Sequence, residues 1–254
     1  MSTHSVAQAI DQRGIAVGAM LYEFDTPGVM RILAAAGVDF AIFDLEHTGW
    51  DAGSLRTLLA TGRGTGVYPI VRVLRAQYEH IASALDAGAK GVMAPMIESE
   101  EEARILVAAA KYPPIGRRGF GVLFSDDLVD GAGAAVDRAN RENLVIAQIE
   151  TVAGIERAES IVAVPGVDIV WLGQFDLTLS LGIPGEFDHP SFLDAVEHLL
   201  TACRRVGKPL GQMVSTVEEG RALRERGFQI FACCDIWVFE RALKEQLRAL
   251  RERS

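Results

Sequence analysis

The stretch FDLEHTGWD, from Phe43 to Asp51, places two acidic residues and a histidine directly after an apolar run. Histidine and carboxylate side chains are common proton-transfer groups, and a neighbouring carboxylate can fix the tautomer of an imidazole. The stretch therefore predicts an acid–base pair of Asp44 and His47. Glu46 is expected to point opposite to its neighbours, as a surface or supporting group. The alternative for His47 is a hydrogen-bonded structural histidine.

Other apolar runs also end in polar residues. Arg72 lies in YPIVRV, Gln148 and Glu150 end LVIAQIE, and Asp176 follows VDIVWLGQF. Two carboxylates suit Mg²⁺ or Mn²⁺, and a guanidinium can bind a carboxylate or a developing enolate oxygen. Together they predict chemistry alpha to the carbonyl of a 2-keto acid. The alternatives are a buried Arg72–Glu150 ion pair and an Asp176 that only caps a helix.

A recurring order of elements must bring these residues together. Alanine-rich helical patterns, a glycine and a short apolar run follow one another, as in LAAAGVDFAIFD and AVPGVDIVWLG. Eight apolar runs are predicted as strands, at residues of about 14–21, 39–45, 68–73, 90–97, 144–150, 167–173, 209–214 and 228–234. Eight alternating units favour a closed (β/α)8 TIM barrel over a doubly wound parallel sheet. Such barrels carry their active sites at the carboxyl ends of the strands, where these polar residues fall.

Several sequence signals predict where helices begin. Thr26-Pro27 is typical of an N-cap followed by a first-turn proline. Ser99 with Glu102 and Thr216 with Glu219 match the capping box. Residues 113–143 are expected to form a long connection that could carry function as a loop.

The last predicted helix, at about residues 236–252, is unusually apolar for a helix that covers its own barrel. Its apolar residues fall near helical spacing: Ile236, Trp237, Phe239, Leu243, Leu247 and Leu250. A contiguous apolar face of this kind predicts an oligomer built partly through this helix. The alternative is an ordinary eighth barrel helix.

Composition narrows the class of protein. A chain of 254 residues suits a single domain over residues 1–254, and a net charge of −9 without a basic stripe argues against nucleic-acid binding. No apolar run reaches the roughly 18 residues of a membrane span, and no signal peptide is recognised, so a cytoplasmic location is expected. Three cysteines without zinc-ligand spacing are expected to be reduced thiols. No lysine ends a central strand, which argues against Schiff-base chemistry.

The motifs FDLEHTGWD, PIVRV, GVMAPMIESEEEA, KYPPIGRRGFG, AQIET and VWLGQFDLTLSLGIPG follow one another between about Gly18 and Asp235. In this order they resemble the class II, metal-dependent pyruvate aldolases of the HpcH/HpaI family. The resemblance implies a (β/α)8 barrel and a homo-hexamer, a trimer of dimers that exchanges its last helix between subunits. It also implies reversible cleavage of a 4-hydroxy-2-oxo acid into pyruvate and an aldehyde, with Mg²⁺, Mn²⁺ or Co²⁺ as cofactor.

The resemblance implies roles for individual residues. His47, Asp44 and Arg72 would be catalytic, and Glu150 and Asp176 would hold the metal. The substrate contacts would come from six residues: Arg72, Gln148, Gly173, Gln174, Phe175 and Asp176. Backbone N–H groups around Gln174 to Asp176 would hold the pyruvate carboxylate. Asp86 is expected in a supporting position, and Arg118 of GRRGFG either supports the site, binds an anion or lies in a solvated loop.

Three positions depart from the family pattern, and the acceptor-aldehyde side of the site does not carry over from the resemblance. Leu45 stands where many members have glycine, Gln174 where proline is common, and Cys233-Cys234 where a glycine-containing turn is expected. The natural aldehyde is therefore not predicted. Two alternatives stay open: an oxaloacetate-decarboxylating or citrate-synthase-like enzyme of the same superfamily, and a non-catalytic keto-acid-binding protein.

Overall fold

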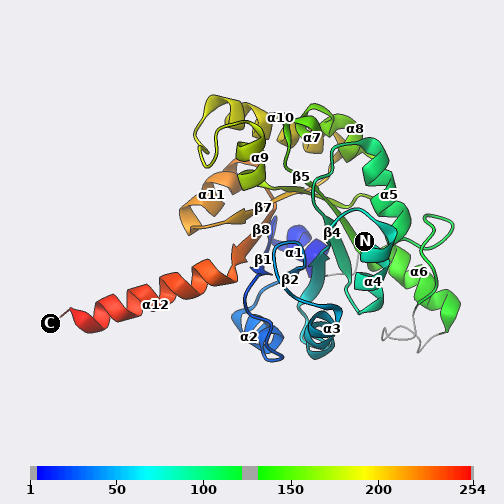
Figure 1. Cartoon of the computed structure of the whole chain (residues 1–254), viewed down its shortest axis with the longest axis horizontal. Coiled ribbons are helices and arrows are strands. Elements are labelled where there is room, and N and C mark those ends of the chain that lie inside the picture. The colour runs from blue at the N-terminus through cyan, green and yellow to red at the C-terminus, as the bar shows by residue number, and fades with distance from the viewer. Residues whose placement is uncertain (1–4, 122–130, 253–254) are drawn as a thin grey trace.

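Eight parallel strands close into a barrel in the computed structural model, which describes residues 5–121 and 131–252 (Figure 1). The strands are β1 (Ala16–Leu21), β2 (Phe40–Asp44), β3 (Tyr68–Arg72), β4 (Gly91–Ala94), β5 (Leu144–Ile149), β6 (Ile169–Leu172), β7 (Leu210–Val214) and β8 (Ile230–Cys234). Each pairs with the next, and β8 pairs with β1. The predicted (β/α)8 barrel is confirmed, and the pairing of β8 with β1 excludes an open doubly wound sheet.

Helices α2 to α11 lie between the strands and surround the barrel, whereas α1 precedes the first strand and α12 follows the last (Figure 1). They are α1 (Ser5–Arg13), α2 (Val29–Ala36), α3 (Ala52–Thr61), α4 (Tyr78–Asp86), α5 (Glu100–Ala110), α6 (Ala132–Glu142), α7 (Val152–Glu156), α8 (Ala158–Ala163), α9 (Gln174–Ser180), α10 (Pro190–Val206), α11 (Val217–Arg226) and α12 (Asp235–Arg251). The outward-facing strand residues and the inner faces of the helices form the larger apolar cluster, as expected for strands that are buried on both faces.

The inward-facing residues form a second apolar cluster inside the barrel. It includes alternate residues of each strand, such as Phe40 and Ile42 on β2 and Ile70 on β3. Because side chains alternate along a strand, the next inward positions are Asp44 and Arg72, at the carboxyl ends. The alternation that fills the barrel therefore also directs polar side chains into its mouth.

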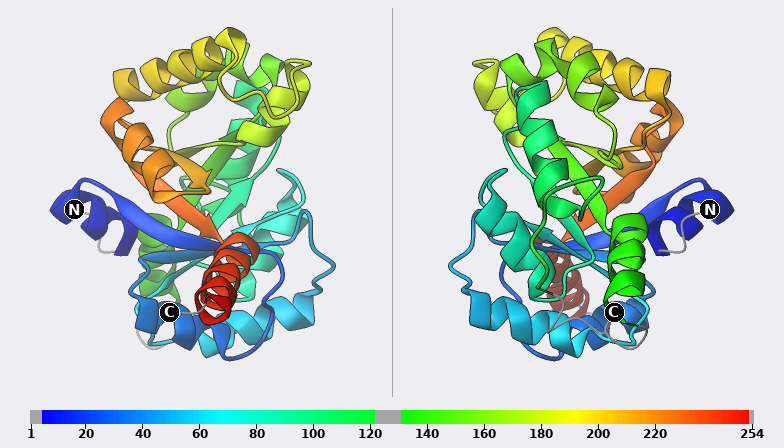
Figure 2. Two further views of the ribbon diagram at one scale, coloured as in Figure 1. Left: turned by 90° about the vertical axis from the view of Figure 1, so that its left-hand side faces the viewer. Right: turned by 90° about the vertical axis from the view of Figure 1, so that its right-hand side faces the viewer.

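The opposite end of the barrel is closed by α1. Val6 and Ala9 of this helix belong to the interior cluster, and Figure 2 shows α1 beyond the amino end of β1. A barrel closed at this end has a packed interior, so the mouth at the carboxyl ends is the place for a site.

Two of the three predicted helix starts are confirmed. Ser99 accepts a hydrogen bond from the backbone N–H of Glu102, and Thr216 accepts one from that of Glu219. The Thr26-Pro27 prediction is wrong, because α2 begins at Val29 after Gly28. The carbonyl of Thr26 accepts from the N–H of Val29 in a turn that precedes the helix, so Pro27 lies in the turn.

The predicted long connection at 113–143 is partly helical, because α6 covers its end. Residues 122–130 lie outside the described part. Lys111, at the start of this connection, is buried and donates through Nζ to the carbonyls of Asn140 and Asn143, 3.1 and 2.5 Å away. These bonds tie the connection to the end of α6.

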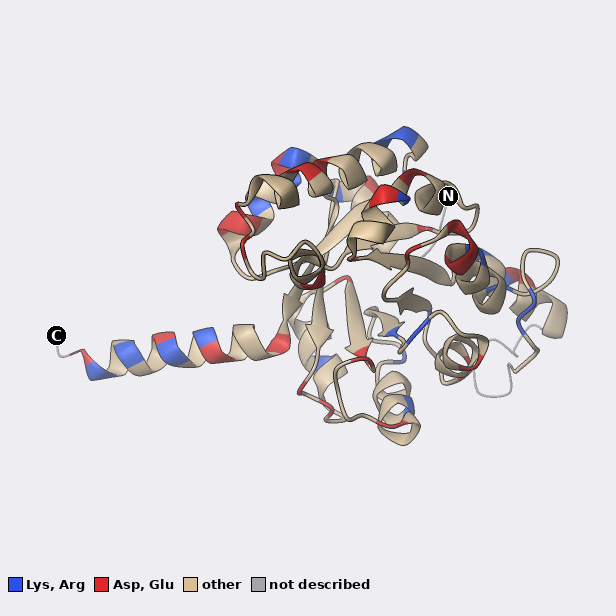
Figure 3. Ribbon diagram, turned by 45° about the horizontal axis from the view of Figure 1, so that its top comes forward, with Lys and Arg blue, Asp and Glu red and all other residues tan. Residues whose placement is uncertain are grey.

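The last helix, α12, projects away from the barrel instead of covering it (Figure 1). Its first turns touch the barrel, among others through ring contacts of Trp237 with Phe175 and of Phe239 with Phe24. Charges of both signs alternate along it (Figure 3), while Leu243 and Leu247 stay exposed. Among the described residues, no helix has the length and apolar character that crossing a membrane requires.

Candidate active site

The mouth of the barrel contains a cavity of about 210 Å³. Its lining comes from the ends of six strands and the residues that follow them: Met20, Tyr22, His47, Arg72, Gln148, Glu150, Trp171, Gly173, Gln174, Phe175, Asp176 and Met213. All the predicted metal and substrate residues line this cavity. Asp44 is fully buried and does not line the cavity itself, but it forms an ion pair with Arg72.

Arg72 is the central cation of the cavity. Asp44 and Arg72 are paired neighbours in the register of β2 and β3, and Nε of Arg72 lies 2.7 Å from Oδ1 of Asp44. Only 5% of Arg72 is exposed. Burial disfavours its charge, but the hydrogen bond and charge of Asp44 outweigh this, and the pKa of Arg72 is raised. The Arg72–Glu150 ion pair considered from the sequence is therefore replaced by an Arg72–Asp44 pair.

Asp44 holds the backbone of His47 and not its ring. Its Oδ2 accepts from the backbone N–H of His47 at 3.0 Å, while Oδ1 accepts from the N–H of Glu46 and from Arg72. With these bonds the carboxylate organises the turn that follows β2. The sequence predicted that Asp44 binds the imidazole of His47, whereas in the structure Asp44 binds the backbone N–H of that residue.

Glu46 supplies the carboxylate beside the imidazole. Its Oε2 lies 3.6 Å from Nε2 of His47 and 3.3 Å from Nε of Arg72. The sequence predicted that Glu46 points away from His47, and this prediction is wrong. The strand β2 ends at Asp44 and the chain bends over residues 45–48, which brings the two side chains together. Burial raises the pKa of Glu46 to about 7, against the lowering effect of Arg72.

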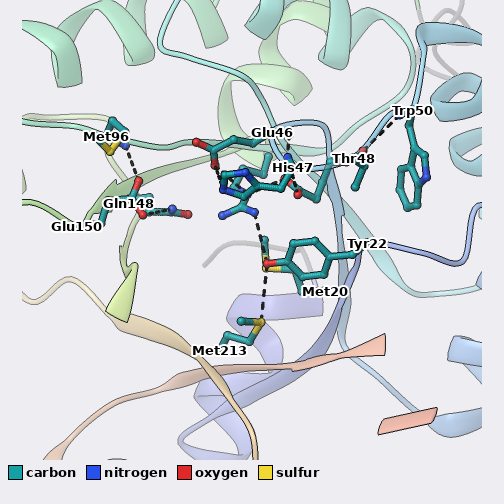
Figure 4. A network of polar contacts seen from close by, with 12 residues as sticks. Met20, Tyr22, Glu46, His47, Thr48, Trp50, Met96, Gln148, Glu150 and Met213 are labelled. Atoms are coloured by element: carbon teal, nitrogen blue, oxygen red, sulfur yellow. Dashed lines mark hydrogen bonds and ion pairs between the residues drawn. The ribbon is translucent and has the colours of Figure 1, made fainter. Parts of the chain in front are cut away.

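Glu150 lies on the wall formed by β5. Its Oε1 accepts from the backbone N–H of Met96 at 2.7 Å, and its Oε2 accepts from Nε2 of Gln148 at 2.5 Å (Figure 4). Burial raises the pKa of Glu150 to about 7, and the charge of Asp176 adds to the shift. A Cβ at Gly173 would lie 2.7 Å from Cβ of Glu150 and closer still to its Oε2, so any larger residue here would displace Glu150.

Asp176 lies in the first turn of α9, whose N-cap is Gly173. The alternative considered from the sequence, that Asp176 only caps this helix, is therefore wrong, because Gly173 is the N-cap residue. The side chain of Gln174 is bound to β7, because its Nε2 donates to the carbonyl of Met213 at 2.9 Å. Phe175 is 41% exposed and packs edge-on against Phe187.

Asp86 and Arg118 do not line the cavity. Their side chains pair with each other at 2.5 Å, between the end of α4 and the connection after α5. The guanidinium of Arg118 also lies over the ring of Tyr112, 4.7 Å from its centroid. This pairing leaves the anion-binding interpretation of Arg118 without support.

Four residues of the cavity were not singled out from the sequence: Met20, Tyr22, Trp171 and Met213. Met20 lies near the end of β1, Tyr22 directly follows this strand, and Trp171 and Met213 lie on β6 and β7. Tyr22 directly follows the first predicted strand, so the rule that located Asp44 would also have found it.

A (β/α)8 barrel with a buried arginine, a histidine and carboxylates in its mouth has the layout of an enzyme. The family model described as HpcH/HpaI aldolase/citrate lyase matches residues 19–234, and the chain belongs to this family. The resemblance noted in the sequence is confirmed.

Two relatives and one solved structure are similar over most of their length. The hydroxypyruvate/pyruvate aldolase of Roseovarius nubinhibens is 35% identical, with 82% of each chain covered. The 2-dehydro-3,6-dideoxy-6-sulfogluconate aldolase of Pseudomonas putida is 34% identical, with 87% of each covered. The crystal structure of an HpcH/HpaI aldolase from Desulfitobacterium hafniense superposes with a TM-score of 0.85 at 30% identity, covering 97% of each chain.

The raised pKa of Glu46 predicts a pH-dependent effect of Glu46→Gln on stability. In the unfolded chain this carboxyl has its ordinary value of 4.5, whereas the native pKa is about 7. Its contribution to the free energy of unfolding is therefore fully present below pH 4.5 and lost as the pH rises through 7. The melting temperature of the wild type should fall relative to that of Glu46→Gln between pH 5 and pH 8, measured by circular dichroism in EDTA. Glu101→Gln, at an exposed carboxylate on α5, is the control, and an equal difference at both pH values would contradict the assignment.

Proposed function

We propose that this protein is a divalent-metal-dependent aldolase that reversibly cleaves a 4-hydroxy-2-oxo acid into pyruvate and an aldehyde. The observation that carries the proposal is the buried, charged Arg72 in a cavity shared with Glu150 and Asp176. A guanidinium in a site shielded from water can stabilise an enolate oxygen. The family and the aldolase names of its relatives agree with this chemistry.

The residues present fit a divalent cation held by Glu150 and Asp176. Both carboxylates line the same cavity, burial raises the pKa of Glu150, and Oε1 of Gln148 is buried without a hydrogen-bond partner in the described structure. No group of three or more potential metal-ligating side chains exists among the described residues, so a bound ion would keep open positions. Two carboxylates with open positions suit Mg²⁺, Mn²⁺ or Co²⁺. When bound, the cation would polarise the substrate ketone and offset the charge of the enolate.

Arg72 would bind and stabilise the enolate. Asp44 occupies its Nε–H and the hydroxyl of Tyr22 accepts from Nη2 at 3.3 Å, which leaves the other N–H groups to face the cavity. Because Asp44 fixes the guanidinium, these donors are oriented before substrate binds. Arg72 is therefore required for every reaction that passes through the enolate.

His47 would accept the proton of the C4 hydroxyl. Its side chain is 58% exposed, at the entrance of the cavity, and Glu46 lies beside its Nε2. Asp44 fixes the backbone of His47, whereas the carboxylate of Glu46 would stabilise the imidazolium that forms. Asp44 and Glu46 thus divide the task that the sequence assigned to Asp44 alone.

Removing the metal should abolish cleavage. The pair of carboxylates cannot polarise a ketone, so activity on 4-hydroxy-2-oxopentanoate should disappear with EDTA and return with Mg²⁺, Mn²⁺ or Co²⁺. The measurement is the rate of pyruvate release before and after metal is restored. Full activity in a sample shown to be metal-free by elemental analysis would refute the class II assignment.

The roles of His47 and Arg72 predict different patterns over three reactions. Decarboxylation of oxaloacetate forms the enolate without removing a hydroxyl proton, whereas aldol cleavage and exchange of pyruvate methyl protons need a base. His47→Ala should lower cleavage and exchange on the order of 10²–10⁴-fold and decarboxylation far less. Arg72→Ala should lower all three, because the enolate oxygen loses its cationic partner. If His47→Ala reduced all three rates equally while still binding metal, His47 would not be the base.

We further propose that α12 joins two copies of the chain, within the homo-hexamer expected from the family. Its exposed leucines lack a partner surface in the described chain. Beside its first turns lies an open apolar groove of about 230 Å³, which is lined by residues of β1, β7, β8, α11 and the start of α12. An eighth barrel helix would normally cover the outer faces of these strands. The α12 of a partner subunit could cover them instead.

Light scattering tests this assembly. The wild type should be oligomeric at micromolar concentration, and Leu243→Gln with Leu247→Gln should shift it toward smaller species by removing apolar contact area. Val206→Gln, at an exposed apolar residue of α10, is the control. A monomeric wild type would refute the proposal.

A further inference from the structure

The hydroxyl of Tyr22 faces the cavity from the end of β1. It accepts a hydrogen bond from Nη2 of Arg72 at 3.3 Å, and the guanidinium carbon lies 5.7 Å from the centre of its ring. The other atoms within reach of the hydroxyl are sulfurs: Sδ of Met20 at 3.3 Å and Sδ of Met213 at 3.9 Å. The polar end of this side chain is thus set between a cation and two thioethers.

This setting leaves the phenolic proton without a strong acceptor. Arg72 has no acceptor atoms, and thioether sulfur accepts hydrogen bonds only weakly. The hydroxyl of a buried tyrosine usually finds a good partner. Among the described residues, no oxygen or nitrogen atom accepts a hydrogen bond from the hydroxyl of Tyr22. Burial raises the pKa of Tyr22 to about 12, so the group keeps its proton and can donate it to a ligand at neutral pH.

The position of Tyr22 is fixed by the first residue of α12. Oδ2 of Asp235 accepts the backbone N–H groups of Tyr22, Glu23 and Phe24 at 3.1, 3.0 and 3.1 Å. Asp235 is itself buried. Three bonds to one carboxylate hold the segment directly after β1 in place, as a preorganised donor requires.

The order of strands decides which part of a substrate Tyr22 can reach. In a closed ring of eight strands β1 lies opposite β5, and Glu150 and Gln148 come from β5. Figure 4 shows these two residues on one side of the cavity, Tyr22 with the methionines on another, and His47 between them. The carboxylate and keto oxygens of a 2-oxo acid belong beside the proposed cation at Glu150. The distal C4 oxygen then points toward β1.

We propose that Tyr22 donates a hydrogen bond to the C4 oxygen of the substrate, and that this contact is catalytic. The inference rests on the proposed aldolase function. During cleavage the base removes the C4 hydroxyl proton, the C4–O electron pair forms the carbonyl, and the C3–C4 bond breaks to leave its electrons in the enolate. Tyr22 keeps its own proton throughout and stabilises the negative charge that develops on the C4 oxygen. In the direction of synthesis the same bond polarises the aldehyde carbonyl.

Tyr22→Phe tests the contact, because it retains the ring and removes only the hydroxyl. Two probes are used with Mg²⁺: 4-hydroxy-2-oxopentanoate, which has a C4 oxygen, and pyruvate, which has none. Loss of one oxyanion donor lowers catalysis on the order of 10²–10³-fold. We expect kcat/KM for cleavage to fall at least about tenfold, while the rate of methyl exchange in D₂O and the Kd of pyruvate by calorimetry stay within about twofold. Tyr78→Phe, whose hydroxyl accepts from the backbone N–H of Gly119 outside the cavity, is the control.

The outcomes separate this inference from the proposed function. If the wild type is active and Tyr22→Phe cleaves the substrate at the same rate, the proposed contact of Tyr22 is wrong, while the aldolase function stands. An equal loss of cleavage and exchange also overturns the contact, because the hydroxyl would then act through Arg72. A wild type that exchanges pyruvate protons but cleaves no 4-hydroxy-2-oxo acid contradicts the aldolase proposal itself, and the role of Tyr22 falls with it. Circular dichroism and the pyruvate Kd verify that the variant is folded.

Discussion

The buried ion pair between Arg72 and Asp44 is the constraint on which the site depends. Taking both charges out of water is costly, and removing one partner of such a pair typically costs about 3–5 kcal/mol. The register of β2 and β3 makes the pair possible, because it places the two residues side by side at the mouth. Asp44 also accepts the backbone N–H groups of Glu46 and His47, so one carboxylate fixes the cation and the turn that carries the proposed base. The charge that would stabilise an enolate is thus held by the barrel itself.

The cavity has chemically different walls because the strands deliver different side chains. The wall at β5 and β6 is acidic, with two carboxylates whose mutual repulsion and burial favour neutralisation by a cation or a proton. The wall at β1 and β7 is formed by Tyr22 and two methionines and carries no formal charge. Arg72 lies on β3, between β1 and β5 in the strand order. Under the proposed mechanism, a bifunctional substrate would bind with its charged end toward Glu150 and its hydroxyl end toward Tyr22.

The fold could be predicted from the sequence because local signals and long-range packing agree. Eight apolar runs between helical patterns became eight strands, and Ser99 and Thr216 form the N-cap hydrogen bonds that were expected of them. The failures occur where the chain leaves regular structure. The turn before α2 displaced the helix start from Thr26, and the bend after β2 brought Glu46 to the imidazole in place of Asp44. Strand alternation cannot describe such bends. Tyr22 was missed for a different reason, since a tyrosine after an apolar run is more often part of a core than of a site.

Exchange of the pyruvate methyl protons in D₂O tests the central claim, that this cavity forms and stabilises an enolate, independently of any aldehyde. The measurement follows the methyl signal by NMR for the wild type with Mg²⁺, with EDTA, and for Glu150→Gln with Mg²⁺. The account predicts loss of the signal only in the wild type with metal, because burial of Arg72 and the proposed cation at Glu150 must act together. An unchanged methyl signal in metal-loaded wild type that binds pyruvate would contradict it.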